Sequence, residues 1–360
     1  MKQEEKEKNL FKSIRPTKII YPILIGLGVV SYMLYKEFDP KAFDMITFTK
    51  YTVIFLIVAL ICMMIRDIGY VIRLRILTDN YMSWRKAIRV ILLWEFTSAI
   101  TPSAIGGTSV AILFIHKEGL SIGKSSAVVM ATSFLDELYF IIMFPLILLT
   151  INSSQLWDVG DVDSTIRSSL INISWIGYSL KLLYLITLSY GLFRNPRGLK
   201  WLILKIFKLP ILRRWKHGAN KAGSDIIVNS KELRAKKFSF WVKAFGTTFF
   251  SWTARYWIVN AILAAFWFSN YAWADHILMF ARQLIMWIMM LVAPTPGGSG
   301  FAEYIFKEFL GNFLPATGLA VAMAVLWRLI TYYPYLFAGV FLLPTWIKDK
   351  FNKQTKEEID

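Results

Sequence analysis

The side chains best able to do chemistry in this sequence are ionisable groups that lie within long apolar stretches. Arg255, Arg282 and Arg328 each interrupt a stretch that is otherwise apolar. An ionised group at mid-membrane depth costs roughly 2.5–3.5 kcal/mol or more, so such groups normally face a bundle interior or an aqueous cavity. A guanidinium in that position can bind an anionic ligand or pair with a carboxylate, and the sequence leaves both interpretations open.

Carboxylates occupy comparable positions. Asp136 and Glu137 lie near the middle of one apolar stretch, and Glu95 lies inside another. Glu303 follows a glycine-rich break. Each is a candidate partner for a deep arginine, and Asp136, Glu137 and Glu303 are also candidate proton carriers. Lys181 is long enough to extend from its apolar stretch to a membrane interface, and we expect it to do so.

Two breaks rich in glycine and proline interrupt the apolar pattern. They are Thr101-Pro102-Ser103-Ala104-Ile105-Gly106-Gly107 and Pro294-Thr295-Pro296-Gly297-Gly298-Ser299-Gly300. Proline and paired glycines interrupt the helical hydrogen-bond ladder, so each segment is predicted to be a broken helix. Ser299 is expected to cap the helix that follows the second break, with Glu303 in its first turn. Such a helix start presents N–H groups and a partial positive charge, which suit a phosphate.

Metal, disulfide and nucleotide chemistry find no support in the sequence. Cys62 is the single cysteine, and His116, His217 and His276 lie far apart without a carboxylate or thiol at metal-ligand spacing. No GxxxxGK[ST] loop occurs, so ATP is not expected to be the direct energy source. No nucleophile–base pair stands out either. We therefore expect no metal, no cofactor and no catalytic set.

The elements that must position these residues are membrane helices. The 360 residues are 56% hydrophobic, 16% aromatic and 18% charged, which is rare in a soluble domain. The apolar stretches are long enough to cross a hydrocarbon layer of roughly 30 Å. The sequence predicts an all-α polytopic membrane protein with six full crossings and two re-entrant broken helices. The crossings are expected at about 19–35, 49–65, 125–151, 170–193, 244–268 and 314–346, and the broken helices at about 90–115 and 277–310.

The distribution of positive charge predicts the orientation. Segments 1–18, 66–89, 117–124, 194–243 and 347–360 hold 32 Lys or Arg residues, whereas segments 36–50 and 152–170 hold four. The positive-inside rule then places the N-terminal segment 1–18 and the tail 347–360 in the cytoplasm, on either side of a transmembrane domain at 19–346. The net charge of +17 is better explained by anionic inner-leaflet lipids than by nucleic acid. Segment 66–89 is expected at the cytoplasmic surface. Segment 194–243 is expected to contain a surface helix that binds those lipids, with a docking site for a partner as the alternative.

This orientation requires the two broken helices to enter from opposite faces. A shared pattern, aromatic-Ile-x-Lys-Glu-x-Leu, follows each break, at residues 114–120 and 304–310. Paired broken helices that enter from opposite faces are typical of transporters built from inverted repeats. The sequence therefore suggests an inverted repeat, with chance similarity as the alternative.

The two breaks and the helix order between them resemble a known family. It is the flippase-like transmembrane domain found at the N-terminus of lysylphosphatidylglycerol synthases and in many stand-alone membrane proteins. The resemblance rests on residues 294–303, on Thr101-Pro102 with Gly106-Gly107, and covers most of residues 15 to 346. It implies translocation of a lipid between leaflets, with the broken helices forming the central site. The chain ends at Asp360 without an aminoacyl-transferase domain, so lysyl-lipid synthesis is not expected.

The resulting hypothesis is a flippase or scramblase of the cell membrane that moves an anionic or phosphate-bearing lipid through a central polar cavity. Its alternatives are an ion-coupled transporter of a small soluble anion, an intramembrane lipid-modifying enzyme and a passive scaffold for another membrane enzyme. A second copy of the chain is left open as a partner. The candidate substrate-binding residues are Arg255, Arg282, Arg328, Glu303, Gly297, Gly298, Ser299, Gly300, Thr101, Pro102, Gly106 and Gly107.

Overall fold

The computed structural model of the chain describes residues 46–101, 104–159, 164–206, 233–266, 271–290 and 297–357, with isolated positions elsewhere. Within these ranges the chain is helical and contains no strand. The predicted N-terminal segment 1–18, most of the predicted first crossing, Pro102 and most of 207–232 lie outside the described residues.

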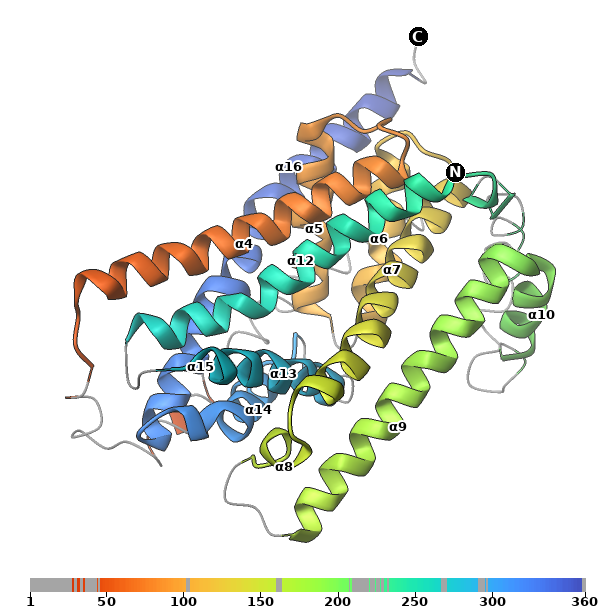
Figure 1. Cartoon of the computed structure of the whole chain (residues 1–360). Helices are drawn as coiled ribbons and strands as arrows, with labels where there is room; N and C mark the ends of the chain where they lie inside the picture. The colour runs from red at the N-terminus through yellow and green to blue at the C-terminus, as the bar shows by residue number, and fades with distance from the viewer. Residues whose placement is uncertain are drawn as a thin grey trace.

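Four helical stretches in the described part are long and apolar enough to cross a membrane. They are α4 (Lys50–Leu77), α7 (Ile122–Thr150), α9 (Ser164–Ser189) with the π-helical turn η1 (Tyr190–Arg194), and α15 (Thr317–Thr331) with α16 (Tyr333–Glu357). A further helix, α12 (Phe238–Ala265), is as long as α4 at 28 residues and packs along it (Figure 1). The prediction of an all-α membrane protein is confirmed.

The polarity of α4 is the reverse of that of a helix in a soluble protein. Its outward face is apolar, and Ile54, Ile57 and Ile61 remain 50%, 50% and 43% exposed. Arg66 and Arg73 instead lie on the interior face, 2% and 5% exposed. Exposed apolar side chains around a charged interior fit lipid as the surrounding solvent.

This helix also corrects the predicted boundary at residue 65. The arginines at 66 and 73 suggested a basic surface segment, but α4 continues to Leu77 and buries both. Carboxylates on neighbouring helices, Glu95 and Asp136, pair with the two arginines and make their burial tolerable, and these partners are not adjacent in the sequence. Only the second half of the predicted surface segment contains the connection to the next helix, α5 (Trp84–Ile100).

The two broken segments form helical hairpins. In the first, α5 packs against α6 (Ala104–Lys117), and in the second, α13 (Trp273–Met289) packs against α14 (Phe301–Leu310). The open end of the first hairpin lies beside the C-terminal end of α16, where Lys350 pairs with Glu118 at 2.7 Å. The open end of the second lies beside the connection that follows α7, where Asn312 donates a hydrogen bond to the carbonyl of Asp158 at 2.9 Å. The hairpins therefore open toward opposite ends of the bundle, as predicted (Figure 1).

Small residues let these helices approach closely. A Cβ at Gly69 of α4 would lie 2.1 Å from Ser251 Oγ of α12, and a Cβ at Gly107 would lie 2.1 Å from Ser98 Oγ. Close helix contacts through small residues are a common way to pack helices in lipid. The second contact corrects the predicted extent of the first break, because Gly106 and Gly107 lie inside α6. Gly107 serves the packing of α6 on α5 and does not break the helix.

The apolar interior is divided between the hairpins. One cluster of buried residues surrounds α13 and α14 and includes Ile285, Phe306 and Phe309. The other surrounds α5 and α6 and includes Phe96 and Phe114. On the far side of α9, the short helix α10 (Pro196–Ile206) carries basic side chains and the exposed Trp201, in keeping with the surface helix predicted within 194–243.

Candidate functional site: the hairpin junction and a deep charged cluster

The tips of the two hairpins meet. The N–H of Gly297, in the second break, donates a hydrogen bond to the carbonyl of Thr101, in the first, at 3.4 Å. The hydroxyl of Tyr332 donates to the carbonyl of Ala99 at 3.0 Å. A Cβ at Gly297 would lie only 2.6 Å from that same carbonyl oxygen. The prediction that the two breaks come together is therefore confirmed, and we call this contact the hairpin junction.

Glycines build the second tip. Gly297, Gly298 and Gly300 have φ values of +57°, +67° and +82°, a region that L side chains rarely adopt. Gly300 is the N-cap of α14, and the Glu303 carboxylate accepts a hydrogen bond from its N–H at 2.8 Å. The predicted cap, Ser299, is wrong, because its hydroxyl instead lies 3.2 Å from the Tyr332 hydroxyl.

Arg328 and Glu303 form a sealed pair beside this tip. Arg328 Nε donates to Glu303 Oε1 at 3.0 Å, and the two side chains are only 8% and 2% exposed. The guanidinium also donates to the carbonyl of Gly297 at 3.0 Å and lies 3.7 Å from the centre of the Tyr332 ring. Of the two interpretations open for Arg328, the geometry supports the structural pair. Arg328 fastens the second tip to α15.

Arg282 is also occupied by the protein. Its two terminal nitrogens donate to the carbonyls of Phe309, Gln155 and Asp158 at 3.1, 2.8 and 2.6 Å. It joins the end of α14 to the connection after α7, which contains α8 (Ser153–Leu156). Its side chain is 3% exposed, so it acts as a backbone clamp near one end of the bundle.

The two carboxylates in the middle of α7 each have a cation of their own. Asp136 pairs with Arg73 of α4 and accepts a further hydrogen bond from Trp252 Nε1 at 2.7 Å. Glu137 accepts two hydrogen bonds from Lys181 of α9, at 2.9 and 2.8 Å. Lys181 is 4% exposed, so its predicted extension to the interface is wrong. An ion pair inside the bundle holds it instead.

A different arrangement surrounds Arg66. Its guanidinium donates to Asp67 of α4 at 3.0 Å, to Glu95 of α5, and to the hydroxyl of Tyr335 on α16. The same hydroxyl donates to Asp67 at 2.6 Å. Two carboxylates thus share one arginine, and their side chains keep 28% and 24% of their surface accessible. Pairing was one interpretation open for Glu95, and its partner is Arg66.

Arg255 is the deep arginine with neither a carboxylate nor a carbonyl of its own. It makes no ion pair or hydrogen bond with any residue that the structure describes. Its guanidinium lies 5.2 Å from the ring of Trp252 and 4.8 Å from that of Trp287. The side chain is partly exposed, and its charge interacts with that of Asp67. Arg255 is therefore available to an anion in a way that Arg282 and Arg328 are not.

These groups belong to one charged cluster. Tyr70 of α4 contacts both Arg66 and Arg73 through its ring, and Trp252 connects Asp136 to Arg255. The deep cluster, as we call it, consists of Arg66, Asp67, Arg73, Glu95, Asp136 and Arg255.

Arg66, Asp67 and Arg73 were not predicted from the sequence to be members of a site. A signal was present, because positions 66, 70 and 73 fall on one face of a helix, and the positions between them are apolar apart from Asp67 and Gly69. The count of basic residues in the segment obscured that periodicity.

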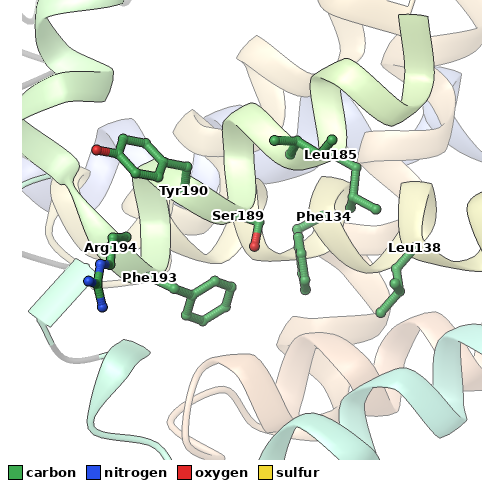
Figure 2. Close-up of a pocket in the computed structure, with 8 residues that line it drawn as sticks. Phe134, Leu138, Leu185, Ser189, Tyr190, Phe193 and Arg194 are labelled. Carbon is green, nitrogen blue, oxygen red and sulfur yellow. The ribbon is translucent and has the colours of Figure 1, made fainter. Parts of the chain in front are cut away.

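Two cavities lie away from the hairpin junction. One, of about 490 Å³, is a groove between α7 and α9 lined mainly by apolar side chains, including Phe134, Leu138 and Leu185 (Figure 2). Ser189, Tyr190 and Arg194 line it toward the end of α9 (Figure 2). The other, of about 460 Å³, is lined by Asp158, Asp275, Arg282 and Asn312 among others.

The fold and the site define a class of protein. Two helical hairpins that enter from opposite ends and meet inside a helical bundle, beside buried charges, are an arrangement of integral membrane proteins with a site at mid-membrane depth. The Lysylphosphatidylglycerol synthase TM region family matches residues 19–339, and the chain belongs to this family. A UPF0104 membrane protein of Archaeoglobus fulgidus is 29% identical over 299 residues, which cover 79% of this chain and 84% of that protein. The resemblance drawn from the two breaks is confirmed.

Proposed function

We propose that this protein moves an anionic, phosphate-bearing lipid between the leaflets of the cell membrane, with the headgroup held at Arg255. The observation that carries the proposal is the state of that side chain. Arg255 is a guanidinium inside a membrane bundle, partly exposed, with two tryptophan rings against it and no carboxylate of the described residues paired with it. A guanidinium without an ion pair keeps its N–H donors available for the oxygens of an anion.

The position of Arg255 next to the deep cluster supports the same proposal. Trp252 connects it to Asp136, and the hairpin that carries Glu95 leads directly to the junction at Thr101. Movement of one hairpin relative to the other would therefore change the surroundings of the headgroup. Family membership supports lipid movement as the activity, since the resemblance implies a flippase-like domain.

The groove between α7 and α9 favours a lipid over a soluble anion. It lies between two helices that are apolar enough to span a bilayer, and Phe134, Leu138 and Leu185 offer an acyl chain an apolar surface (Figure 2). Arg194 lines the same groove, where a phosphate could approach it (Figure 2). A soluble anion would gain nothing from these apolar walls.

We further propose that both termini are cytoplasmic. The basic helix α10 then lies on the inner leaflet, and its exposed Trp201 and neighbouring Lys205 suit the headgroup region of anionic lipids.

The test is reconstitution of the purified protein into liposomes that contain a headgroup-labelled phosphatidylglycerol. A quencher added outside reports the labelled lipid that reaches the outer leaflet. The wild type is expected to move the label faster than empty liposomes, and Arg255→Ala is expected to return the rate to that background. Asp349→Asn is the matched control, because Asp349 is 59% exposed and pairs only loosely with Arg89 at 3.6 Å.

The alternatives give different results in the same system. Inhibition of labelled-lipid movement by a soluble phosphate ester, with uptake of that ester, would favour the soluble-anion transporter. A chemically altered lipid would favour the enzyme. Rates equal to those of empty liposomes across a panel of anionic lipids would contradict the proposal and favour the scaffold.

A further inference from the structure

The charges of the deep cluster balance only when Arg255 is counted. Arg73 is matched by Asp136, whereas Asp67 and Glu95 share Arg66. One carboxylate is therefore in excess locally, and the charge of Arg255, which forms no ion pair with a described residue, acts on Asp67 through space. The whole cluster contains three arginines and three carboxylates, so it is neutral when every group is ionised.

An anionic headgroup at Arg255 would upset this balance. The headgroup adds a negative charge to a neutral cluster in a medium of low effective dielectric constant, where an uncompensated charge is costly. Two carboxylates held close to one cation relieve such an excess by sharing a proton, and the apparent titration then belongs to the pair. We infer that Asp67 and Glu95 together take up one proton from water when an anion binds at Arg255, so that lipid and proton move in the same direction. This inference rests on the proposed function.

The surroundings of the two carboxylates fit this role. The groups that face them are Arg66 and Tyr70 from α4, Arg255 from α12 and Tyr335 from α16. Both side chains keep about a quarter of their surface accessible, so water can deliver a proton. Glu303 is only 2% exposed and has Arg328 to itself, so it is a poorer carrier. Asp136 and Glu137, also predicted as carriers, each have a cation of their own.

Glu95 also connects the pair to the hairpin that would move. It lies on α5, and the following residues lead to Ala99 and Thr101 at the junction. A proton on the pair would weaken the contact between Arg66 and Glu95, which joins α4 to this hairpin. Proton uptake and hairpin release would then be the same event.

The experiment adds a pH dye inside the liposomes used above. With the wild type, acid on the side from which the labelled phosphatidylglycerol departs is expected to speed its movement, by up to about tenfold per pH unit for one coupled proton. The label moves from the inner to the outer leaflet in this assay, so the dye is expected to report proton loss from the lumen in step with lipid movement. Asp67→Asn and Glu95→Gln are expected to move lipid without this pH dependence and without proton loss from the lumen, whereas Asp349→Asn keeps both.

A stability measurement tests the excess of charge without transport. If one carboxylate of the pair is in excess, Asp67→Asn and Glu95→Gln each lower the melting temperature in detergent by less than about 2 °C. Asp136→Asn leaves Arg73 unmatched and is expected to lower it by about 5 °C or more. Equal losses in all three variants would overturn the inference. Lipid movement by the wild type without proton loss from the lumen would also overturn the inference, and it would leave the proposed function intact. No lipid movement at all would contradict the function itself.

Discussion

Arg328 and Arg255 lie deep in apolar helices and look alike in the sequence, yet the structure uses them differently. Arg328 is enclosed by Glu303, the carbonyl of Gly297 and the ring of Tyr332. Arg255 meets only two tryptophan rings among the described residues and remains partly exposed. Protein oxygens neutralise and hydrogen-bond the guanidinium of Arg328, whereas the guanidinium of Arg255 is left available to a ligand.

The difference lies in what the neighbouring element offers. The second break supplies Arg328 with a carbonyl, a hydroxyl and a capping carboxylate, all within one short tip. The helix faces around Arg255 supply aromatic rings, which attract a cation but do not neutralise it. The region of Arg328 thus holds the junction together, and the region of Arg255 keeps a charge available. Substitutions in the first region are therefore expected to change stability, and substitutions in the second to change lipid movement.

The largest effect is expected from Glu303→Ala. It removes the partner of Arg328 and the acceptor for the Gly300 N–H, and leaves a buried cation unmatched. The free energy of unfolding is expected to fall by about 3–5 kcal/mol. Thermal unfolding in detergent would measure this loss. Glu308→Gln is the control, because Glu308 is 25% exposed and pairs with its neighbour Lys307; equal melting temperatures for the two variants would show that the pair is not structural.

The next largest effect is expected from Gly297→Ala at the junction. The residue has a φ of +57°, and a Cβ there would lie 2.5 Å from the Tyr332 ring and 2.6 Å from the carbonyl oxygen of Ala99. Backbone strain of about 1–2 kcal/mol adds to a steric cost of about 1–3 kcal/mol.

The control for that variant is Gly311→Ala, whose Cβ would meet only Ala320 at 3.9 Å. Thermal unfolding is expected to separate the two glycines clearly. If Gly297→Ala lowers the melting temperature no more than Gly311→Ala does, the hairpin tips are not in contact.

A smaller effect on stability is expected from Arg255→Ala, because the variant loses ring contacts worth about 0.5–2 kcal/mol and a through-space interaction with Asp67, but no ion pair with a described residue. Lipid movement is expected to fall about tenfold or more, as a charge-assisted hydrogen bond to the headgroup disappears. Arg255→Lys keeps the charge and is expected to restore part of the rate. Liposome transport measures the rate of lipid movement, and thermal unfolding of the same preparations measures stability. A variant that unfolds as readily as Glu303→Ala would assign Arg255 to the structure.

Much of the architecture could be predicted from the sequence because lipid imposes simple constraints. Length and apolarity identified the long helices, and glycine with proline identified both tips. The opposite entry of the hairpins followed from the charge distribution in the loops. These are local or additive properties, so one sequence suffices to read them.

The partners of the buried charges could not be predicted in the same way. Glu95 lies 29 positions from Arg66, and Asp136 lies 63 positions from Arg73. Several pairings were equally consistent with the sequence, and only the packing of α4 against α5, α7 and α12 selects among them. The prediction that Lys181 extends to a membrane interface was wrong for the same reason, since nothing near it in the sequence indicates that Glu137 of α7 lies within 3 Å.

The smallest effect on stability is expected from Ser189→Trp in the groove between α7 and α9 (Figure 2). The indole would fill space that we assign to an acyl chain, without breaking an ion pair. Its control is Ile176→Trp on the lipid-facing side of α9, where the side chain is already 60% exposed. Both variants are expected to unfold like the wild type. Only the tryptophan at residue 189 is expected to slow lipid movement, by a few-fold, because the loss of one apolar contact is worth about 1 kcal/mol. Equal rates for the two variants would separate the groove from the lipid path and leave Arg255 as the only described contact for the substrate.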